Sequence, residues 1–198
     1  MWRKAEKFLL RDKYLAPLIK KWGHCAIKPR IHVDYFQGLI GEIIGQQLSG
    51  RVADVIEGRL KAKIKRRLTP NKILSLPDDE LRSCGMAWSK VRAIEDLSQR
   101  VKSRKLHIRK LSMLPDDEVK RELIAVKGIG PWTVDMFLMF SLGRADIFPT
   151  EDLGIQKGFE KVTGRKFDKI KSAGFAEKHW KPYRTVASWY LWRSLENK

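Results

Sequence analysis

The spacing of apolar residues constrains the fold of this chain most strongly. Between residues 39 and 60 they recur every three or four positions, which is the period of one face of an α-helix. We therefore expect one long helix with a buried face over this stretch. The positions that define this face are Leu39, Ile40, Ile43, Ile44, Leu48, Val52, Val55, Ile56 and Leu60.

Helical spacing continues through most of the chain, and signals for β-strands are weak. No run of alternating β-branched residues ends in an Asn-Gly or Asp-Gly turn, which would indicate a hairpin of two strands. The pattern predicts an all-α protein of about eight to ten helices.

Two helix starts share the motif Leu-Pro-Asp-Asp-Glu, at residues 76–80 and 114–118. Backbone N–H groups at a helix start have no partner within the helix, so proline, which has no N–H, is well suited to this position. Acidic residues in the first turn complement the helix dipole. A glycine turn and a further helix follow each motif, and we expect these helices over residues 89–101 and 131–142. Alternatively, the motif is only a favourable helix start that occurs twice.

The second glycine turn lies in residues 127–133, Lys-Gly-Ile-Gly-Pro-Trp-Thr, which we call the hairpin. Its two glycines permit positive φ angles and leave backbone N–H groups uncovered by side chains. Such groups can bind a phosphate of a nucleic-acid backbone without reading its bases. An ordinary glycine cap between two packed helices is the alternative interpretation.

The charge of the chain favours a polyanionic partner. Its 198 residues include 41 Lys and Arg against 23 Asp and Glu, which gives a formal net charge of +18. The hydrophobic fraction of 43% is enough for a core, so this charge belongs to a folded body and not to a disordered tail. Nucleic acid is the commonest partner of such a surface, with ribosomes, anionic membranes and plain solubility as alternatives.

Other classes of protein are disfavoured. No apolar run approaches the length of a membrane span, and Arg11, Asp12 and Lys13 interrupt the apolar cluster near the N-terminus, so we expect neither a membrane segment nor a signal peptide. Cys25 and Cys84 are too few for a disulfide framework and are interpreted as small buried side chains. We expect an intracellular protein, in the cytoplasm or nucleoid of a prokaryote or the nucleus of a eukaryote, with no metal and no cofactor.

Four segments together resemble the helix-hairpin-helix (HhH-GPD) DNA glycosylase superfamily, over about residues 36 to 195. The hairpin is one segment, and the loop that carries Asp152, 22 positions after Gly130, is the second. The other two are similar to the alkylated-base branch, which includes 3-methyladenine DNA glycosylase II. They are Ile-Ile-Gly-Gln-Gln-Leu-Ser at residues 43–49 and Trp-Lys-Pro-Tyr-Arg at residues 180–184, followed by Trp189, Tyr190 and Trp192.

The resemblance implies two helical lobes with an active-site cleft between them. One lobe would span residues 36–115, and residues 1–35 with 116–198 would form the other and carry the hairpin and Asp152. It further implies a monomeric, monofunctional enzyme of base excision repair. Such an enzyme flips an alkylated purine, such as 3-methyladenine or 7-methylguanine, out of double-stranded DNA containing damaged bases and hydrolyses its N-glycosidic bond to leave an abasic site.

Asp152 is the expected catalytic group, with the adjacent Glu151 as a second candidate. A carboxylate near the anomeric carbon stabilises the oxocarbenium-like sugar and helps a water molecule to attack it. An aspartate that opens a helix after Pro-Thr also fits an N-cap, and both roles can coexist.

The tryptophans bear on the subclass and on the base pocket. Trp132 stands where bifunctional relatives similar to endonuclease III carry a lysine that forms a Schiff base, so no AP lyase activity is expected. The iron–sulfur cluster of those relatives needs four cysteines near the C-terminus, which this chain does not contain. The resemblance places Trp132 and Trp192 in the base pocket, although buried tryptophans commonly serve the core. Met136 and Leu153 occupy places where the family has tyrosines, which leaves the substrate range open.

The remaining candidates contact DNA. Gln46, Gln47 and Leu48 are candidates to fill the gap that the flipped base leaves, or alternatively lie in a helix interior. Ser89 and Lys90 are candidates to hold a second phosphate. The expected contacts to the DNA backbone are Lys127, Gly128, Ile129, Gly130, Trp132 and Thr133. Two rival functions stay open: a non-catalytic protein that binds damaged or branched DNA, and a glycosylase for deaminated or oxidised bases.

Overall fold

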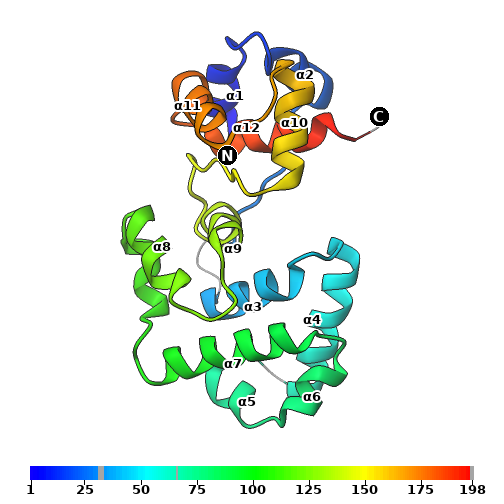
Figure 1. Ribbon diagram of the computed structural model, residues 1–198, viewed down its shortest axis with the longest axis vertical. Coiled ribbons are helices and arrows are strands. Elements are labelled where there is room, and N and C mark those ends of the chain that lie inside the picture. Colours follow the sequence, from blue (N-terminus) through cyan, green and yellow to red (C-terminus); the bar gives the residue numbers. More distant parts are fainter. Residues whose placement is uncertain (31–33, 66, 197–198) are drawn as a thin grey trace. The chain divides into compact units, whose positions relative to one another are not determined.

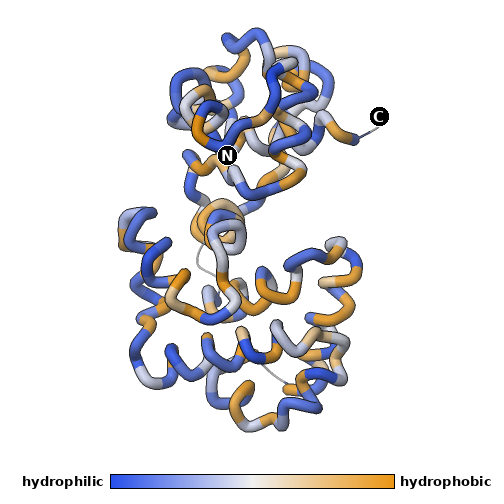
Figure 2. Tube along the Cα trace, in the orientation of Figure 1, coloured by the Kyte–Doolittle hydropathy of each residue, from blue (hydrophilic) through white to orange (hydrophobic). Residues whose placement is uncertain are grey.

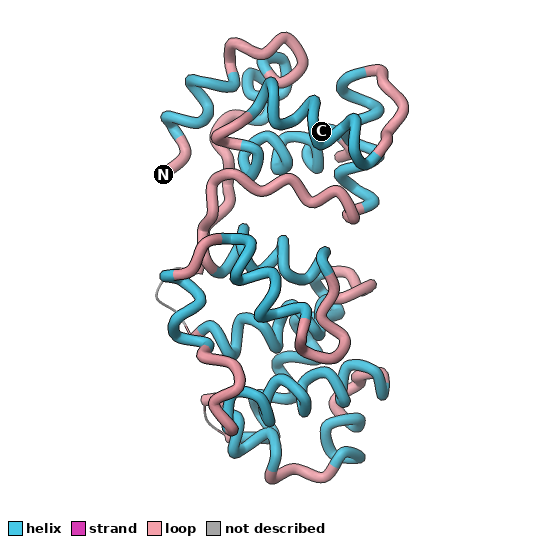
Figure 3. Tube along the Cα trace, turned by 60° about the vertical axis from the view of Figure 1, so that its left-hand side comes forward, coloured by secondary structure: helices cyan, strands magenta, loops and turns pink. Residues whose placement is uncertain are grey.

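The computed structural model describes residues 1–30, 34–65 and 67–196. Within these ranges the chain forms helices joined by turns and loops, without a strand (Figure 3), which confirms the all-α prediction. The chain divides into two compact units. Met1–Pro29 and Leu138–Lys198 form the discontinuous unit, and Arg30–Phe137 form the continuous unit.

The boundary between these units differs from the expected one at residue 115. Residues 116–137, which include the hairpin, belong to the continuous unit because α9 packs against both α3 and α8. The predicted cleft between two lobes stays a prediction.

The discontinuous unit is organised around α12, which contacts α10, α2, α11 and α1 (Figure 1). Gly158 allows the close approach of α10 to α12, since a Cβ atom at this position would lie 2.5 Å from the carbonyl oxygen of Leu191. Phe148, Phe159 and Trp180 form edge-to-face pairs beside this contact. The helices of this unit are α1 (Arg3–Leu9), α2 (Ala16–Trp22), α10 (Leu153–Thr163), α11 (Lys169–Trp180) and α12 (Arg184–Ser194).

The continuous unit packs α7 against α5 and α3, and α3 against α4 (Figure 1). Its interior is aliphatic, with Leu39, Ile43, Leu60 and Ile94 all removed from solvent. The α-helices are α3 (Tyr35–Gly45), α4 (Gly50–Ile64), α5 (Pro70–Leu74), α6 (Asp78–Ser83), α7 (Trp88–Lys102), α8 (Asp116–Ile124) and α9 (Pro131–Met136), and a 3-10 helix spans Ile108–Met113.

The single long helix expected over residues 39–60 is wrong. The chain leaves the helical conformation after Gly45, passes through a turn at residues 46–49 in which Gln47 has φ +56°, and begins α4 at Gly50. Glycines at both ends of this turn lower the helix propensity there. This break, together with the short α5 and α6, brings the described part of the chain to twelve α-helices, more than expected.

The predicted helix starts are confirmed. Asp78 and Asp116 open α6 and α8 directly after a proline. The helix expected over residues 89–101 is α7, whereas the helix that starts at Pro131 changes at Phe137 into a π-helical turn, η2 (Phe137–Ser141).

Hydrophilic residues interrupt the hydrophobic ones along the helices of both units (Figure 2). Among the described residues, no helix combines the length and the hydrophobicity that crossing a bilayer requires. Cys84 is buried and Cys25 is half-buried, both as free thiols, and burial raises the pKa of Cys25 to about 12.

Candidate functional site

The hairpin is a tight turn between α8 and α9 that only glycine can make at its first bend. Gly128 has φ +77°, and a Cβ atom there would lie 2.9 Å from the Cβ of Ala93 on α7. Ile129 is buried and anchors the turn in the continuous unit. The hairpin backbone is therefore pressed onto α7.

The backbone N–H groups of the hairpin fall into two sets. Lys127 N–H donates to Asp96 Oδ2 at 2.8 Å, and Ile129 N–H donates to the carbonyl of Val126 at 3.1 Å. For the N–H groups of Gly128 and Gly130, no acceptor is found within the residues that the structure describes. Two donors are thus open to an outside ligand, and they come from the two glycines that the sequence indicates.

Asp96, which sequence reasoning missed, holds the hairpin from α7. Burial by itself would raise the pKa of this carboxyl group, but the N–H of Lys127 and the guanidinium of Arg100 outweigh it and hold the pKa below its usual value. Arg100 Nε donates to Asp96 Oδ2 at 2.8 Å. No sequence signal pairs Asp96 with a residue 31 positions away.

The three candidates for gap filling lie in the turn between α3 and α4. Gln46 Nε2 donates to the Gly128 carbonyl at 3.0 Å and to Thr133 Oγ1 at 2.8 Å. Gln47 and Leu48 are exposed. The alternative of a helix interior is wrong for all three residues, because this turn separates the two helices.

Ser89 and Lys90, the candidates for a second phosphate, lie in the first turn of α7. Ser89 is exposed. Lys90 Nζ instead donates to the carbonyls of Ile44 and Gln46, at 2.8 Å each, and burial lowers its pKa. These bonds engage its ammonium group within the continuous unit.

The four candidates for the base pocket divide between the units. Trp132 is half-buried and Met136 is buried in the continuous unit. In the discontinuous unit, Leu153 is 67% exposed, while Trp192 is half-buried and stacks on Phe140 with ring centroids 6.1 Å apart. A pocket formed by all four residues stays a prediction.

Asp152 caps α10 and also holds the indole of Trp192. Its Oδ1 accepts the N–H of Ile155 at 2.9 Å and the Nε1–H of Trp192 at 2.8 Å. The glycine two positions later makes room for this contact, since a Cβ atom on Gly154 would lie 2.8 Å from Trp192 Cδ1 and 3.0 Å from Asp152 Oδ1. The orientation of the carboxylate is therefore fixed from two directions.

Glu151, the second candidate, has a different environment. It is exposed and forms an ion pair with Lys169 at the start of α11. Its carboxylate is thus directed to the surface, while that of Asp152 is held by the buried Ile155 and the half-buried Trp192.

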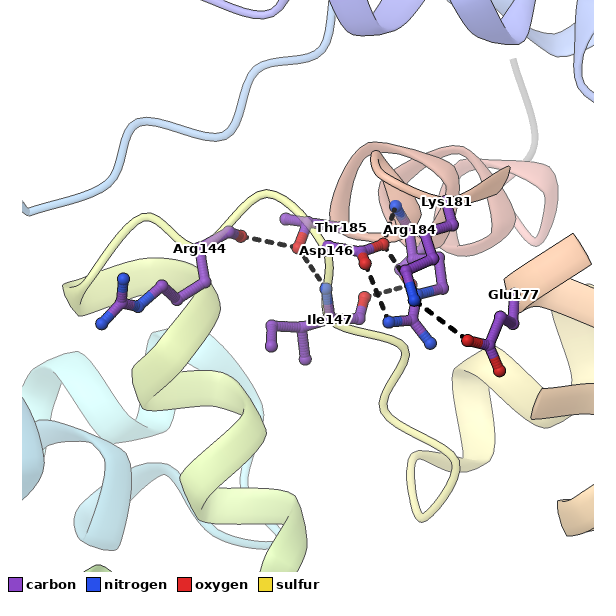
Figure 4. Close-up of polar contacts among 8 residues, drawn as sticks. Arg144, Asp146, Ile147, Glu177, Lys181, Arg184 and Thr185 are labelled. Atoms are coloured by element: carbon purple, nitrogen blue, oxygen red, sulfur yellow. Dashed lines mark hydrogen bonds and ion pairs between the residues drawn. The ribbon is translucent and has the colours of Figure 1, made fainter. Parts of the chain in front are cut away.

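The loop of residues 143–152, which we call the aspartate loop, is fastened to the start of α12 (Figure 4). Arg184 donates from Nε to Asp146 Oδ1 at 2.7 Å and from a terminal nitrogen to Oδ2 at 2.9 Å, a bidentate pair. Thr185 Oγ1 donates to the carbonyl of Arg144 at 2.7 Å and accepts the N–H of Ile147 at 3.0 Å. Helix α12 therefore holds this loop at residues 144–147 through its first turn and at Asp152 through Trp192.

The arrangement offers oriented backbone donors at the hairpin and a fixed carboxylate at the aspartate loop. In the part of the chain that the structure describes, His, Cys, Asp and Glu form no group of three or more that could hold a metal ion. The oriented donors suit anion binding, and the fixed carboxylate suits stabilisation of a positive charge.

Comparison with known proteins gives consistent matches. The profile of the HhH-GPD superfamily base excision DNA repair proteins matches residues 40–182. DNA-3-methyladenine glycosylase 1 of Schizosaccharomyces pombe is 31% identical over 165 residues, covering 80% of this chain and 72% of that protein.

Two solved structures are similar over nearly the whole chain. A DNA-3-methyladenine glycosidase from Bacillus halodurans has a TM-score of 0.81 and 33% identity, covering 96% of this chain and 88% of the other. The S. pombe 3-methyladenine DNA glycosylase Mag1, in complex with abasic DNA, has a TM-score of 0.81 and 28% identity, covering 96% of both chains.

Proposed function

This chain belongs to the HhH-GPD superfamily of base excision DNA repair proteins, and from that membership we propose that it is a DNA glycosylase that removes alkylated purines. Its partner is double-stranded DNA that contains damaged bases, and it acts as a monomer inside the cell. Relatives and solved structures named for 3-methyladenine support this substrate class. The observation that carries the proposal is the carboxylate of Asp152, fixed by Trp192 and by the first turn of α10.

Removal of an alkylated purine needs little activation of the leaving base. An N3- or N7-alkylated purine carries a positive charge, so its glycosidic bond is already weak. The enzyme must extrude the nucleotide and stabilise a sugar that becomes oxocarbenium-like as this bond breaks. A fixed carboxylate near the anomeric carbon supplies that stabilisation and aligns a water molecule for attack.

The hairpin would hold the DNA backbone beside the lesion. The N–H groups of Gly128 and Gly130 are the proposed phosphate ligands, since those of Lys127 and Ile129 are engaged within the unit. Ser89 is the proposed contact to a second phosphate. The cationic base would be bound between the faces of Trp132 and Trp192, beside Met136 and Leu153.

The proposed enzyme leaves an intact abasic site. Trp132 stands where a lyase would need an amine, and an indole cannot form a Schiff base. Borohydride should therefore trap no covalent adduct between the protein and a cleaved substrate.

The substitution Asp152→Asn tests the proposal. An asparagine oxygen can still cap α10 and accept the Trp192 bond, so we expect a folded protein that binds abasic DNA but releases 3-methyladenine and 7-methylguanine from methylated DNA at least 100-fold more slowly. Glu151→Gln is the matched control and should retain activity within a few fold. If wild type releases no base from such DNA, the proposal fails in favour of a binding protein; release of only deaminated or oxidised bases would change the substrate class.

A further inference from the structure

One side chain links two segments of the continuous unit that are far apart in sequence. The Gln46 amide nitrogen donates to the Gly128 carbonyl and to Thr133 Oγ1, which lie 82 and 87 positions further along the chain. The Gly128 carbonyl can only accept, so the amide face turned toward the hairpin must be the NH2 group. Both hydrogens of this group are then used.

These two bonds hold the hairpin at its bend and at its exit. Gly128 adopts φ +77° at the bend, and Thr133 lies in the first turn of α9. The pair of bonds from Gln46 to Gly128 and Thr133, which we call the strut, fixes the directions of the open N–H groups of Gly128 and Gly130. Asp96 holds the same turn from α7 through the N–H of Lys127, so two side chains clamp the hairpin.

The backbone of Gln46 is fixed as firmly as its side chain. Carbonyl groups at the end of a helix lack partners within the helix. The Lys90 ammonium supplies a partner here, donating to the carbonyls of Ile44 and Gln46 at the end of α3. Gln46 is therefore anchored to α7 by its main chain and to the hairpin by its amide.

The next residue is presented to solvent in consequence. Gln47 follows directly with φ +56°, a conformation that non-glycine residues rarely adopt, and its side chain is exposed. A strained conformation persists where neighbouring contacts hold the chain, and the bonds of Gln46 and Lys90 lie directly before it. Of the two glutamines, Gln46 is committed to the protein and Gln47 is available to DNA.

We propose that Gln46 is a positioning residue that sets the hairpin and the α3–α4 turn in register, so that backbone binding and gap filling by Gln47 depend on one side chain. The inference rests on the proposed function for the meaning of gap filling. The coupling itself, between the hairpin and the α3–α4 turn, affects DNA binding and does not depend on catalysis.

The first test compares the affinities of Gln46→Ala and Gln47→Ala for an undamaged duplex and for the same duplex with an abasic site. Gln46→Ala should weaken binding to the undamaged duplex by about five- to tenfold, because the hairpin contacts are made there too. It should weaken binding to the abasic duplex by at least that factor, because gap filling by Gln47 is disturbed as well. Gln47→Ala should leave the undamaged affinity within twofold and weaken abasic binding selectively. Gln46 is half-buried, and an unchanged thermal midpoint would show that the fold is retained.

The second test is a double-mutant cycle with Thr133→Val, which removes the hydroxyl at nearly constant volume. If the strut exists, Thr133→Val should weaken both duplexes less than Gln46→Ala does, and the double variant should bind no more weakly than Gln46→Ala alone. Gln46→Glu keeps the size but turns an oxygen toward the Gly128 carbonyl, and should bind both duplexes more weakly than Gln46→Ala.

Three results would overturn the inference: an effect of Gln46→Ala on abasic DNA alone, additive effects of the two variants in the cycle, or unchanged affinity of Gln46→Ala for both duplexes. The activity proposal fails separately. If wild type releases no alkylated base while the binding pattern holds, the function is wrong and the role of Gln46 stands.

Discussion

Gly154 leaves the space in which Trp192 binds the proposed catalytic carboxylate. A methyl group at this position would lie 2.8 Å from Trp192 and 3.0 Å from the Asp152 oxygen that Trp192 binds. Real Cβ atoms essentially never approach other atoms as closely as 2.8 Å, so the indole must move, and we expect the bond between Trp192 and Asp152 to lengthen or break.

We therefore expect Gly154→Ala to lower the rate constant for base release at saturating DNA by about 10- to 100-fold, with abasic-DNA affinity reduced less than threefold. Single-turnover kinetics on methylated DNA would measure this rate constant. Trp192→Phe removes the donor without adding volume and is the matched comparison. If Gly154→Ala released bases at the wild-type rate, the bond to Trp192 would have no part in orienting Asp152.

For single residues, the sequence predicted those conformations that depend on residues nearby in the chain. The positive φ of Gly128 and the cap position of Asp152 follow from turn and helix-start preferences, and both are confirmed. Gly130 instead has φ −105°, an extended conformation that does not need glycine. The bonds of Gln46, Lys90 and Asp96 were not predictable, because each joins a side chain to a backbone group 31 to 82 positions away. No local preference encodes such pairs.

Among the elements, α3 and α4 show what hydrophobic periodicity can and cannot predict. Their buried residues were identified, but the turn between them was not, because an apolar stripe continues across Leu48 and Val52. In the structure three positions expected on the buried face are exposed: Leu48 by 37%, Val52 by 45% and Val55 by 48%. Periodicity reports the side chains that could face a core, whereas the glycines at 45 and 50 determine where the helices end.

The contact between α3 and α4 contains a carboxyl group that should make stability depend on pH. Burial, with the neighbouring Glu57, raises the pKa of Glu42 to about 7 although Arg30 opposes the shift. A raised pKa means that the folded state binds the proton more tightly than the unfolded state. The stability from this group is complete below its ordinary value of 4.5 and is lost as the pH rises through about 7.

Glu42→Gln should remove this dependence. We expect the variant to exceed wild type in free energy of unfolding by about 2 kcal/mol at pH 8 and to match it at pH 4.5, as measured by urea denaturation. A variant that is less stable than wild type at pH 8 would show that the charged form is favoured by its contact with Arg30.

For the whole molecule, the division into units could not be read from the sequence. The family resemblance implied a boundary at residue 115, but α9 packs on α3 and α8, and this packing assigns the hairpin to the continuous unit. Such an assignment depends on contacts between helices that are distant in sequence. Hydrophobic periodicity identifies the faces that pack but not their partners.

The net charge of +18 is a property of the whole chain, and it should govern affinity without entering the chemistry. Each phosphate that a protein neutralises contributes about −0.9 to the slope of log affinity against log salt concentration. We expect binding to undamaged duplex to weaken on the order of a hundredfold between 50 and 200 mM salt, which corresponds to about four phosphates. The rate of base release at saturating DNA should stay nearly constant, because Asp152 and its partners form a local hydrogen-bonded site.

A substitution of Lys127 separates the contribution of side-chain charge to phosphate binding from that of the backbone donors. Lys127 is the one basic side chain of the hairpin and is exposed. Lys127→Ala should reduce the magnitude of the salt slope by about one if the ammonium contacts a phosphate, while the backbone donors of Gly128 and Gly130 remain. Residual binding with a shallower slope would assign the hairpin contact to backbone amides. Loss of all binding in this variant would instead assign it to the lysine charge.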